Sequence, residues 1–211
     1  MHSSRPSAPR GRAAGRLIRV GAPPELESTS TPARDRARAR LIALLQRAHA
    51  GERAAWHAYA GHQRAVWSAE ERERIARIGD EELEHRRDVG RMLAELGARP
   101  SGWRERALLL IGVVIHVLCR LGAWTGPCGW YAAMDGAGRL EAGNVQEYVT
   151  AAELARDAGI PGYVAPLLQM ALVEWEHERY FHERCAGHWL NRLAPGWRRP
   201  PQPPTVLGES A

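Results

Sequence analysis

Glu82-Leu83-Glu84-His85 recurs later in the chain as Glu174-Trp175-Glu176-His177, and this repeat decides the predicted fold. On a helix, residues i and i+3 lie about 60° apart on the same face, so each Glu-x-x-His pair can direct a carboxylate and an imidazole at one point. Two such pairs on two helices, with one more Glu from each of two other helices, form the ligand pattern of dinuclear metal sites in helix bundles. The repeat therefore predicts two metal-binding helices, and two further carboxylates have to be found.

The rest of the chain supplies the helices that this pattern needs. Apolar residues recur at spacings of three and four in four segments, which predicts helices over about 33–66, 69–96, 130–158 and from 163 onward. Ser68-Ala69-Glu70-Glu71 is a capping box that starts the second helix, and Gly97 ends it. The fold class expected is all-α: a four-helix bundle of two duplicated hairpins, joined by an apolar crossover helix at about 105–125.

Glu52 and Glu141 supply the two missing carboxylates. Each lies in the apolar line of its helix, and each is followed seven residues later by a tyrosine, Tyr59 or Tyr148. Glu147 is the rival on the third helix, but it is displaced from Glu141 by about 120° and cannot face the same centre. The predicted metal ligands are Glu52, Glu82, His85, Glu141, Glu174 and His177. The two tyrosines are expected to hydrogen-bond to the ligands, with plain packing as the other interpretation.

The charge of this set favours metal ions over buried salt bridges. An unpaired buried carboxylate costs several kcal/mol, and four carboxylates are neutralised by two divalent cations. Carboxylates together with imidazoles suit iron, or manganese as an alternative, whereas a tetrahedral zinc site needs no six-ligand cage. The remaining histidines, which have no matched spacing, are expected to be structural or exposed: His57, His62, His116, His182 and His188.

Residues 107–119 are apolar almost all the way round. A helix of this length measures about 20 Å and cannot cross a hydrocarbon core of about 30 Å. Two interpretations remain open at this point. The first is a buried crossover helix that links the two hairpins, and the second is a segment that enters one leaflet of a membrane.

Composition sets the limits of the domain and of its partners. The chain has 211 residues, 45% hydrophobic and 25% charged, which is typical of one globular domain with tails. Residues 1–32 are expected to be a disordered basic tail, with a transit peptide as the alternative, residues 33–194 the bundle, and residues 195–211 a Pro-rich tail.

No secretory signal is evident, and no nucleic-acid partner is expected because much of the net charge of +5 lies in the tails. Three cysteines without a C-x-x-C pair indicate free thiols in a reducing compartment.

Over about residues 42–190 the chain resembles the ferritin-like di-iron superfamily, and within it the demethoxyubiquinone hydroxylase family of ubiquinone biosynthesis. The residues that carry the resemblance are Gly51-Glu52 with Tyr59-Ala60-Gly61, Asp80-Glu81-Glu82-Leu83-Glu84-His85, Arg99-Pro100-Ser101 before the apolar helix, and Ala132-Ala133-Met134. The resemblance implies metal ligation by the six residues named above and a membrane-associated intervening helix. One position differs: the family has His-Tyr where this chain has Glu147-Tyr148.

The function expected is that of a di-iron monooxygenase acting on an apolar, quinone-like substrate, with two iron ions and molecular oxygen as co-substrate. The alternatives are a ferroxidase or peroxide-consuming protein that uses the same six ligands, and a metal-binding interaction protein without turnover. Contact of residues 107–119 with a membrane surface and formation of a homo-oligomer are further expectations. The expected location is the cytoplasm, with peripheral association with the inner face of the membrane.

Overall fold

A computed structural model describes residues 31–193 and 196–204 of the chain. Its described part is all-α, as predicted, and contains no strand. The α-helices are α1 (Pro32–His62), α2 (Ala69–Glu95), α3 (Gly102–Gly122), α4 (Pro127–Asp157) and α5 (Val164–Ala186). Three short 3-10 turns, Ala123–Thr125, Pro161–Tyr163 and Trp189–Arg192, lie beside or after them.

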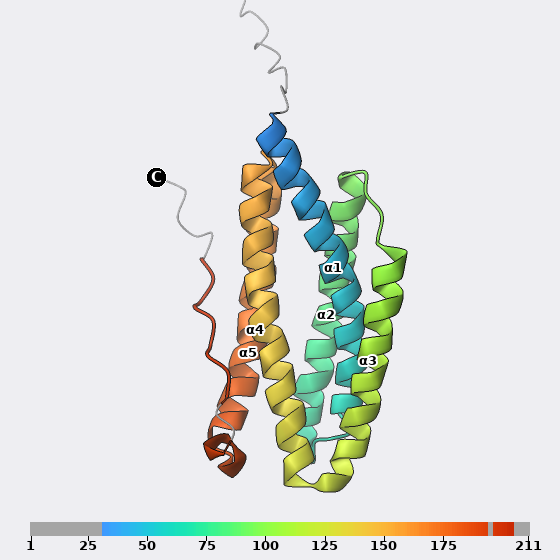
Figure 1. Cartoon of the computed structure of the whole chain (residues 1–211). Helices are drawn as coiled ribbons and strands as arrows, with labels where there is room; N and C mark the ends of the chain where they lie inside the picture. The colour runs from blue at the N-terminus through green and yellow to red at the C-terminus, as the bar shows by residue number, and fades with distance from the viewer. Residues whose placement is uncertain (1–30, 194–195, 205–211) are drawn as a thin grey trace, which may run out of the picture.

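The helices form two hairpins that pack side by side (Figure 1). α1 packs against α2, α4 packs against α5, and the contact between α1 and α4 joins the hairpins. α3 connects the hairpins and lies along the outer side of α1 (Figure 1). The predicted bundle of two hairpins with an extra apolar helix is therefore confirmed.

Local sequence signals explain where the helices begin and end. The Ser68 side chain accepts a hydrogen bond from the Glu71 amide at 3.4 Å, which caps the start of α2. After α2 and after α4 the chain turns at Gly97 and Gly159, both at positive φ, where a side chain would be strained. α1 ends four residues earlier than the predicted limit at Val66, yet Val66 is still buried in the core.

The core has a polar layer between two apolar clusters. One cluster contains Leu45, Val89 and Leu167, and the other contains Ile78, Met134 and Phe181. Along every helix of the two hairpins, the predicted ligands fall between residues of the first cluster and residues of the second. The apolar clusters therefore close off the polar layer from both ends of the bundle.

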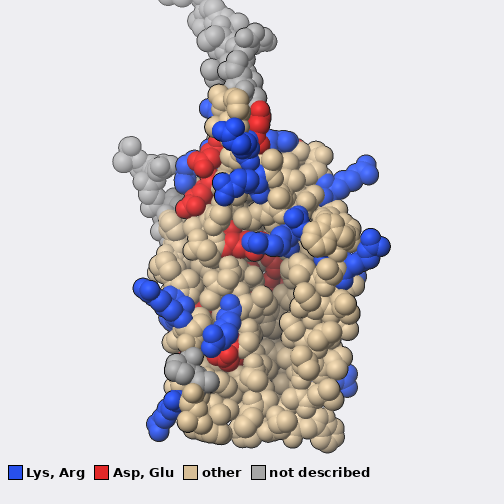
Figure 2. Space-filling view, viewed as in Figure 1, with Lys and Arg blue, Asp and Glu red and all other residues tan. Residues whose placement is uncertain are grey.

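Of the two interpretations of the apolar crossover helix, burial between the hairpins is contradicted by the structure. Gly112 alone among the residues of α3 is buried, whereas Leu118 and Leu121 are each 60% exposed and Trp124 is 89% exposed. Figure 2 shows mostly uncharged side chains on this part of the surface below the first turn of α3. Together with the 3-10 turn that follows, Gly102–Thr125 is the one segment in the described ranges that is long and apolar enough to cross a membrane.

Small residues and one polar cluster attach α3 to α1. A Cβ atom on Gly112 would lie 2.5 Å from the Ala54 carbonyl oxygen, so glycine is required for this close approach. Near the start of α3, Glu105 accepts a hydrogen bond from Arg86 at 2.8 Å and lies 2.7 Å from Nδ1 of His49. α3 is thus fixed to the bundle along one side, and its other side faces outward.

Residues 196–204, which we call the C-terminal strap, pack against α4 and α5. Nε1 of Trp197 donates to Oε1 of the fully buried Glu178 at 2.9 Å, and Arg199 donates to both oxygens of the same carboxylate. The Trp197 ring fills the space where a Cβ atom on Gly138 would lie. Part of the segment predicted to be a Pro-rich tail therefore contacts the bundle through polar anchors.

The N-terminal segment 1–30 and residues 205–211, which belong to the predicted tails, lie outside the described residues. The three cysteines are free thiols, as expected: Cys119, Cys128 and Cys185.

Candidate metal centre

The six predicted ligands converge in the polar layer. They come from the middle of four helices: Glu52 from α1, Glu82 and His85 from α2, Glu141 from α4, Glu174 and His177 from α5. All six side chains are buried. Glu147 lies apart from them and forms an ion pair with Arg47 at 3.0 Å. Glu141 rather than Glu147 therefore lies with the other five side chains, as the helical phase of the two residues predicts.

The ligand atoms form two overlapping groups, and within each group they lie within 4.8 Å of one another. The first group is Glu52, Glu82, His85 and Glu174, and the second is Glu82, Glu141, Glu174 and His177. Glu82 and Glu174 belong to both groups. Two carboxylates shared between two sets, each completed by one carboxylate and one imidazole, could hold two metal ions close together.

Protein hydrogen bonds leave much of this layer unsatisfied. Both oxygens of Glu82, Oε2 of Glu52, Oε2 of Glu174 and Nδ1 of His177 have no hydrogen-bond partner among the described residues. Buried acceptors without donors are costly, and an ionised pair of carboxylates is more so. Two divalent cations would bind these oxygens and the imidazole nitrogen at once, so the residues present fit a dinuclear metal centre.

The pKa values respond to the crowding of carboxylates. Burial, together with the charge of Glu82, raises the pKa of Glu52 well above its ordinary value, and burial with the charge of Glu174 does the same for Glu141. Burial also opposes ionisation of Glu174, but the imidazole of His177 at 3.6 Å and that of His85 at 2.9 Å outweigh it and lower the pKa of Glu174. Without cations, Glu52 and Glu141 therefore bind a proton more readily than an ordinary glutamate does, and metal binding would compete with that proton.

Two tyrosines connect the hairpins across this layer. The Tyr59 hydroxyl of α1 donates to Oε1 of Glu141 on α4, and the Tyr148 hydroxyl of α4 donates to Oε1 of Glu52 on α1. Each tyrosine therefore orients the carboxylate of the opposite hairpin, which reproduces the internal duplication in three dimensions. These are hydrogen bonds to predicted ligands, as expected of the two tyrosines. Both phenol rings are also buried in the core, so packing contributes as well.

Sequence reasoning missed two further contacts. Oε2 of Glu81 lies 2.6 Å from Nε2 of His177, and Nδ2 of Asn144 donates to Oε2 of Glu141 at 3.0 Å. Glu81 stands outside the apolar line of α2, where an acidic residue usually faces solvent. The sequence offered no signal for this contact, because it is made between two helices and no spacing within α2 reveals it.

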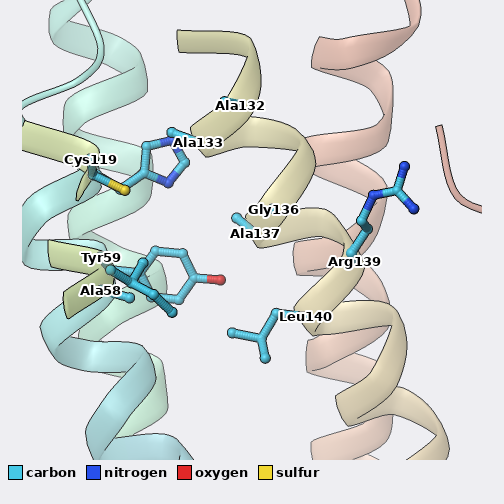
Figure 3. Close-up of a pocket in the computed structure, with 11 residues that line it drawn as sticks. Ala58, Tyr59, Cys119, Ala132, Ala133, Gly136, Ala137, Arg139 and Leu140 are labelled. Carbon is cyan, nitrogen blue, oxygen red and sulfur yellow. The ribbon is translucent and has the colours of Figure 1, made fainter. Parts of the chain in front are cut away.

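An apolar cavity of about 390 Å³ lies beside the metal centre, between α1, α3 and α4. Figure 3 shows Tyr59 and Leu140 in its wall, with the small residues Ala133 and Gly136 opening space along α4. Tyr59 lines the cavity and its hydroxyl donates to Glu141, so one side chain contacts both the cavity and a predicted ligand. A second cavity of about 170 Å³ shares Leu140 with the first and is lined by Glu52.

His62 brings a polar group to the wall of the larger cavity. The side chain is buried, and its Nε2 has no hydrogen-bond partner in the described ranges. Burial lowers the pKa of His62 to about 3, so the ring is neutral near pH 7. His62 was predicted to be structural or exposed; it is buried and stacks on Phe181, with ring centroids 5.7 Å apart.

Comparison with known proteins adds one match. Residues 39–142 match the family model described as ubiquinone biosynthesis protein COQ7. The match spans α1 to the middle of α4 and includes Glu52, Glu82, His85 and Glu141. No curated protein and no solved structure gives a significant match.

Proposed function

We propose that this chain, whose residues 39–142 belong to the family of the ubiquinone biosynthesis protein COQ7, is a di-iron hydroxylase of a quinone-like ring. The family is one of hydroxylases. The observation that carries the proposal is the pair of ligand groups that share Glu82 and Glu174, placed directly beside an apolar cavity. The expected similarity to the demethoxyubiquinone hydroxylase family is thus confirmed, while the substrate and the metal remain our proposal.

Two bound iron ions would supply the activation of molecular oxygen. With two electrons and two protons from a reductant, that chemistry would place one oxygen atom in a ring C–H bond as a hydroxyl group and release the other as water. Four carboxylates and two imidazoles of the chain would hold the metals, and the hydroxyls of Tyr59 and Tyr148 orient the carboxylates of Glu141 and Glu52. The apolar cavity wall keeps water away from the reacting ring.

The larger cavity suits an apolar ring with few polar groups. Its volume lies in the range of about 300–1,000 Å³ that is usual for small-molecule sites. A neutral His62 would form one hydrogen bond with a ring oxygen, which would satisfy the nitrogen that lacks a partner. Charged side chains in the wall are limited to Arg139 among the described residues, so a polyanionic substrate is disfavoured.

α3 would connect the cavity with a membrane. Ile115 and Cys119 of α3 line the cavity, whereas Leu118 and Leu121 on the same helix are exposed. An exposed apolar surface of this kind marks a site of contact with lipid or protein. We propose that the outer side of α3 enters one leaflet, so that an apolar substrate passes from the bilayer into the cavity along this helix.

The proposal is tested on anaerobically prepared protein loaded with ferrous iron. We expect about two irons per chain, and oxygen consumption that depends on a reductant and a short-chain benzoquinone with a free ring position. The product should be heavier by one oxygen atom. Glu82→Ala should lose most of its iron, because Glu82 belongs to both ligand groups.

Two results would contradict the hydroxylase. Full iron retention in Glu82→Ala would refute the site, and rapid iron oxidation with no ring product would favour the ferroxidase alternative. Sedimentation with liposomes tests the membrane contact separately. Wild type should co-sediment, and a variant with Leu118→Glu and Leu121→Glu should remain in the supernatant.

A further inference from the structure

The internal repeat is asymmetric at one position next to the metal ligands. Glu81 directly precedes Glu82 in α2, and Val173 directly precedes Glu174 in α5. The two residues occupy the same place in the two Glu-x-x-His motifs, yet one is a carboxylate and the other is apolar. Both line a surface depression of about 220 Å³ between α2 and α5.

This asymmetry reaches the two histidine ligands. Nδ1 of His177 faces the carboxylates, 3.3 Å from Glu82, while its Nε2 lies 2.6 Å from Oε2 of Glu81. Arg74 in turn lies 3.4 Å from the same oxygen of Glu81. In the other motif, Nδ1 of His85 lies 2.9 Å from Glu174, but no described residue forms a hydrogen bond with its Nε2. His177 therefore has a carboxylate behind it, and His85 has none.

A carboxylate that accepts the outer N–H of a metal-binding histidine fixes the ring and makes its other nitrogen a better donor. Removal of such a partner typically lowers metal affinity about 10- to 100-fold. We propose that Glu81 is a positioning residue that makes the two metal sites unequal. The site of His177 and Glu141 then binds its metal more tightly, and fills first, than the site of His85 and Glu52. This inference rests on the dinuclear centre proposed above.

The test is a titration of metal-free protein with cobalt(II), followed by visible absorption in competition with a chelator. Wild type should bind two ions in two resolved steps. In Glu81→Ala the tighter step should weaken about 10- to 100-fold while the weaker step stays within about twofold. Glu81→Gln, which keeps an accepting oxygen without the charge, should give an intermediate loss. Glu84→Ala is the matched control, because it removes an exposed carboxylate from the same helix.

The outcomes separate this inference from the function on which it rests. Failure of the wild type to bind two ions would refute the dinuclear centre itself. Two equal steps in wild type, or a Glu81→Ala titration identical to that of Glu84→Ala, would refute the inequality alone. An equal weakening of both steps in Glu81→Ala would also refute it, because that result indicates general damage rather than the loss of one partner.

Discussion

His62 should give the folded protein a measurable dependence of stability on pH. Its pKa is lowered by burial from the ordinary value of 6.5 to about 3 in the folded chain. Below pH 6.5 the unfolded chain takes up a proton on this residue, whereas the folded chain does not until about pH 3. Stability therefore falls as the pH drops through this window, and the contribution of His62 is fully present only above it.

The magnitude follows from the two pKa values. Between pH 7 and pH 5, the uptake of a proton by the unfolded state alone lowers the free energy of unfolding by about 2 kcal/mol. In His62→Gln this part of the loss should disappear, because glutamine does not titrate. The free energy of unfolding is measured by urea denaturation of the metal-free protein at both pH values, and the losses on acidification are compared between wild type and variant.

Other titrating groups, including the carboxylates of the metal centre, affect both proteins and largely cancel in this comparison. His57→Gln, on the same helix, is the control; its partly exposed ring should change the loss by less. If wild type and His62→Gln lose the same free energy between pH 7 and pH 5, His62 is not held neutral in the cavity wall. In that case His62 would not serve as a neutral hydrogen-bonding group beside the substrate.

Three further changes test other parts of the structure. Tyr148→Phe should lower the stability of the metal-free protein by about 1–3 kcal/mol in urea denaturation, because Glu52 loses a buried donor; no loss would contradict the crossed contacts. Gly112→Ala should lower the free energy of unfolding, measured by urea denaturation, by about 1–3 kcal/mol because the added methyl group overpacks the contact with α1. Gly143→Ala is the control, since a Cβ atom there meets nothing within 4 Å, and it should be neutral or stabilising. Equal effects of the two substitutions would contradict the close approach of α3 to α1. Glu178→Ala should release the C-terminal strap, seen as faster proteolysis after residue 195, and an unchanged cleavage rate would contradict its anchoring.

The two hairpins could be predicted from sequence because the apolar lines along their helices are long and regular. Ile75, Ile78, Glu82, His85 and Val89 keep spacings of three and four through the middle of α2, and all are buried. A carboxylate within such an apolar line is predicted to be buried, and a buried carboxylate requires a cation or a hydrogen-bond donor beside it. The same logic located Glu52 and Glu141, since each interrupts an apolar line at the same height in the bundle.

The parts that could not be predicted lack periodicity or depend on a neighbour. α3 is apolar on every side, so its sequence does not distinguish burial in protein from exposure to lipid, and both interpretations stayed open until the structure showed the helix to be exposed. The C-terminal strap is held by hydrogen bonds to Glu178 rather than by an apolar face, which leaves no pattern to find. Glu81 contacts His177 across two helices, and no spacing within one helix reveals that contact.

The sharing of Glu82 and Glu174 between both ligand groups also has a consequence for assembly. Each group takes three side chains from one hairpin and one from the other, so a bound metal pair acts as a cross-link between two halves that are joined covalently only through α3. Within each hairpin, helices that follow one another in the chain pack together, α1 with α2 and α4 with α5, which favours rapid local folding of each half. The last step of maturation would then be the closure of two preformed halves around their ions, and the first step of decay would be their separation when the ions are lost.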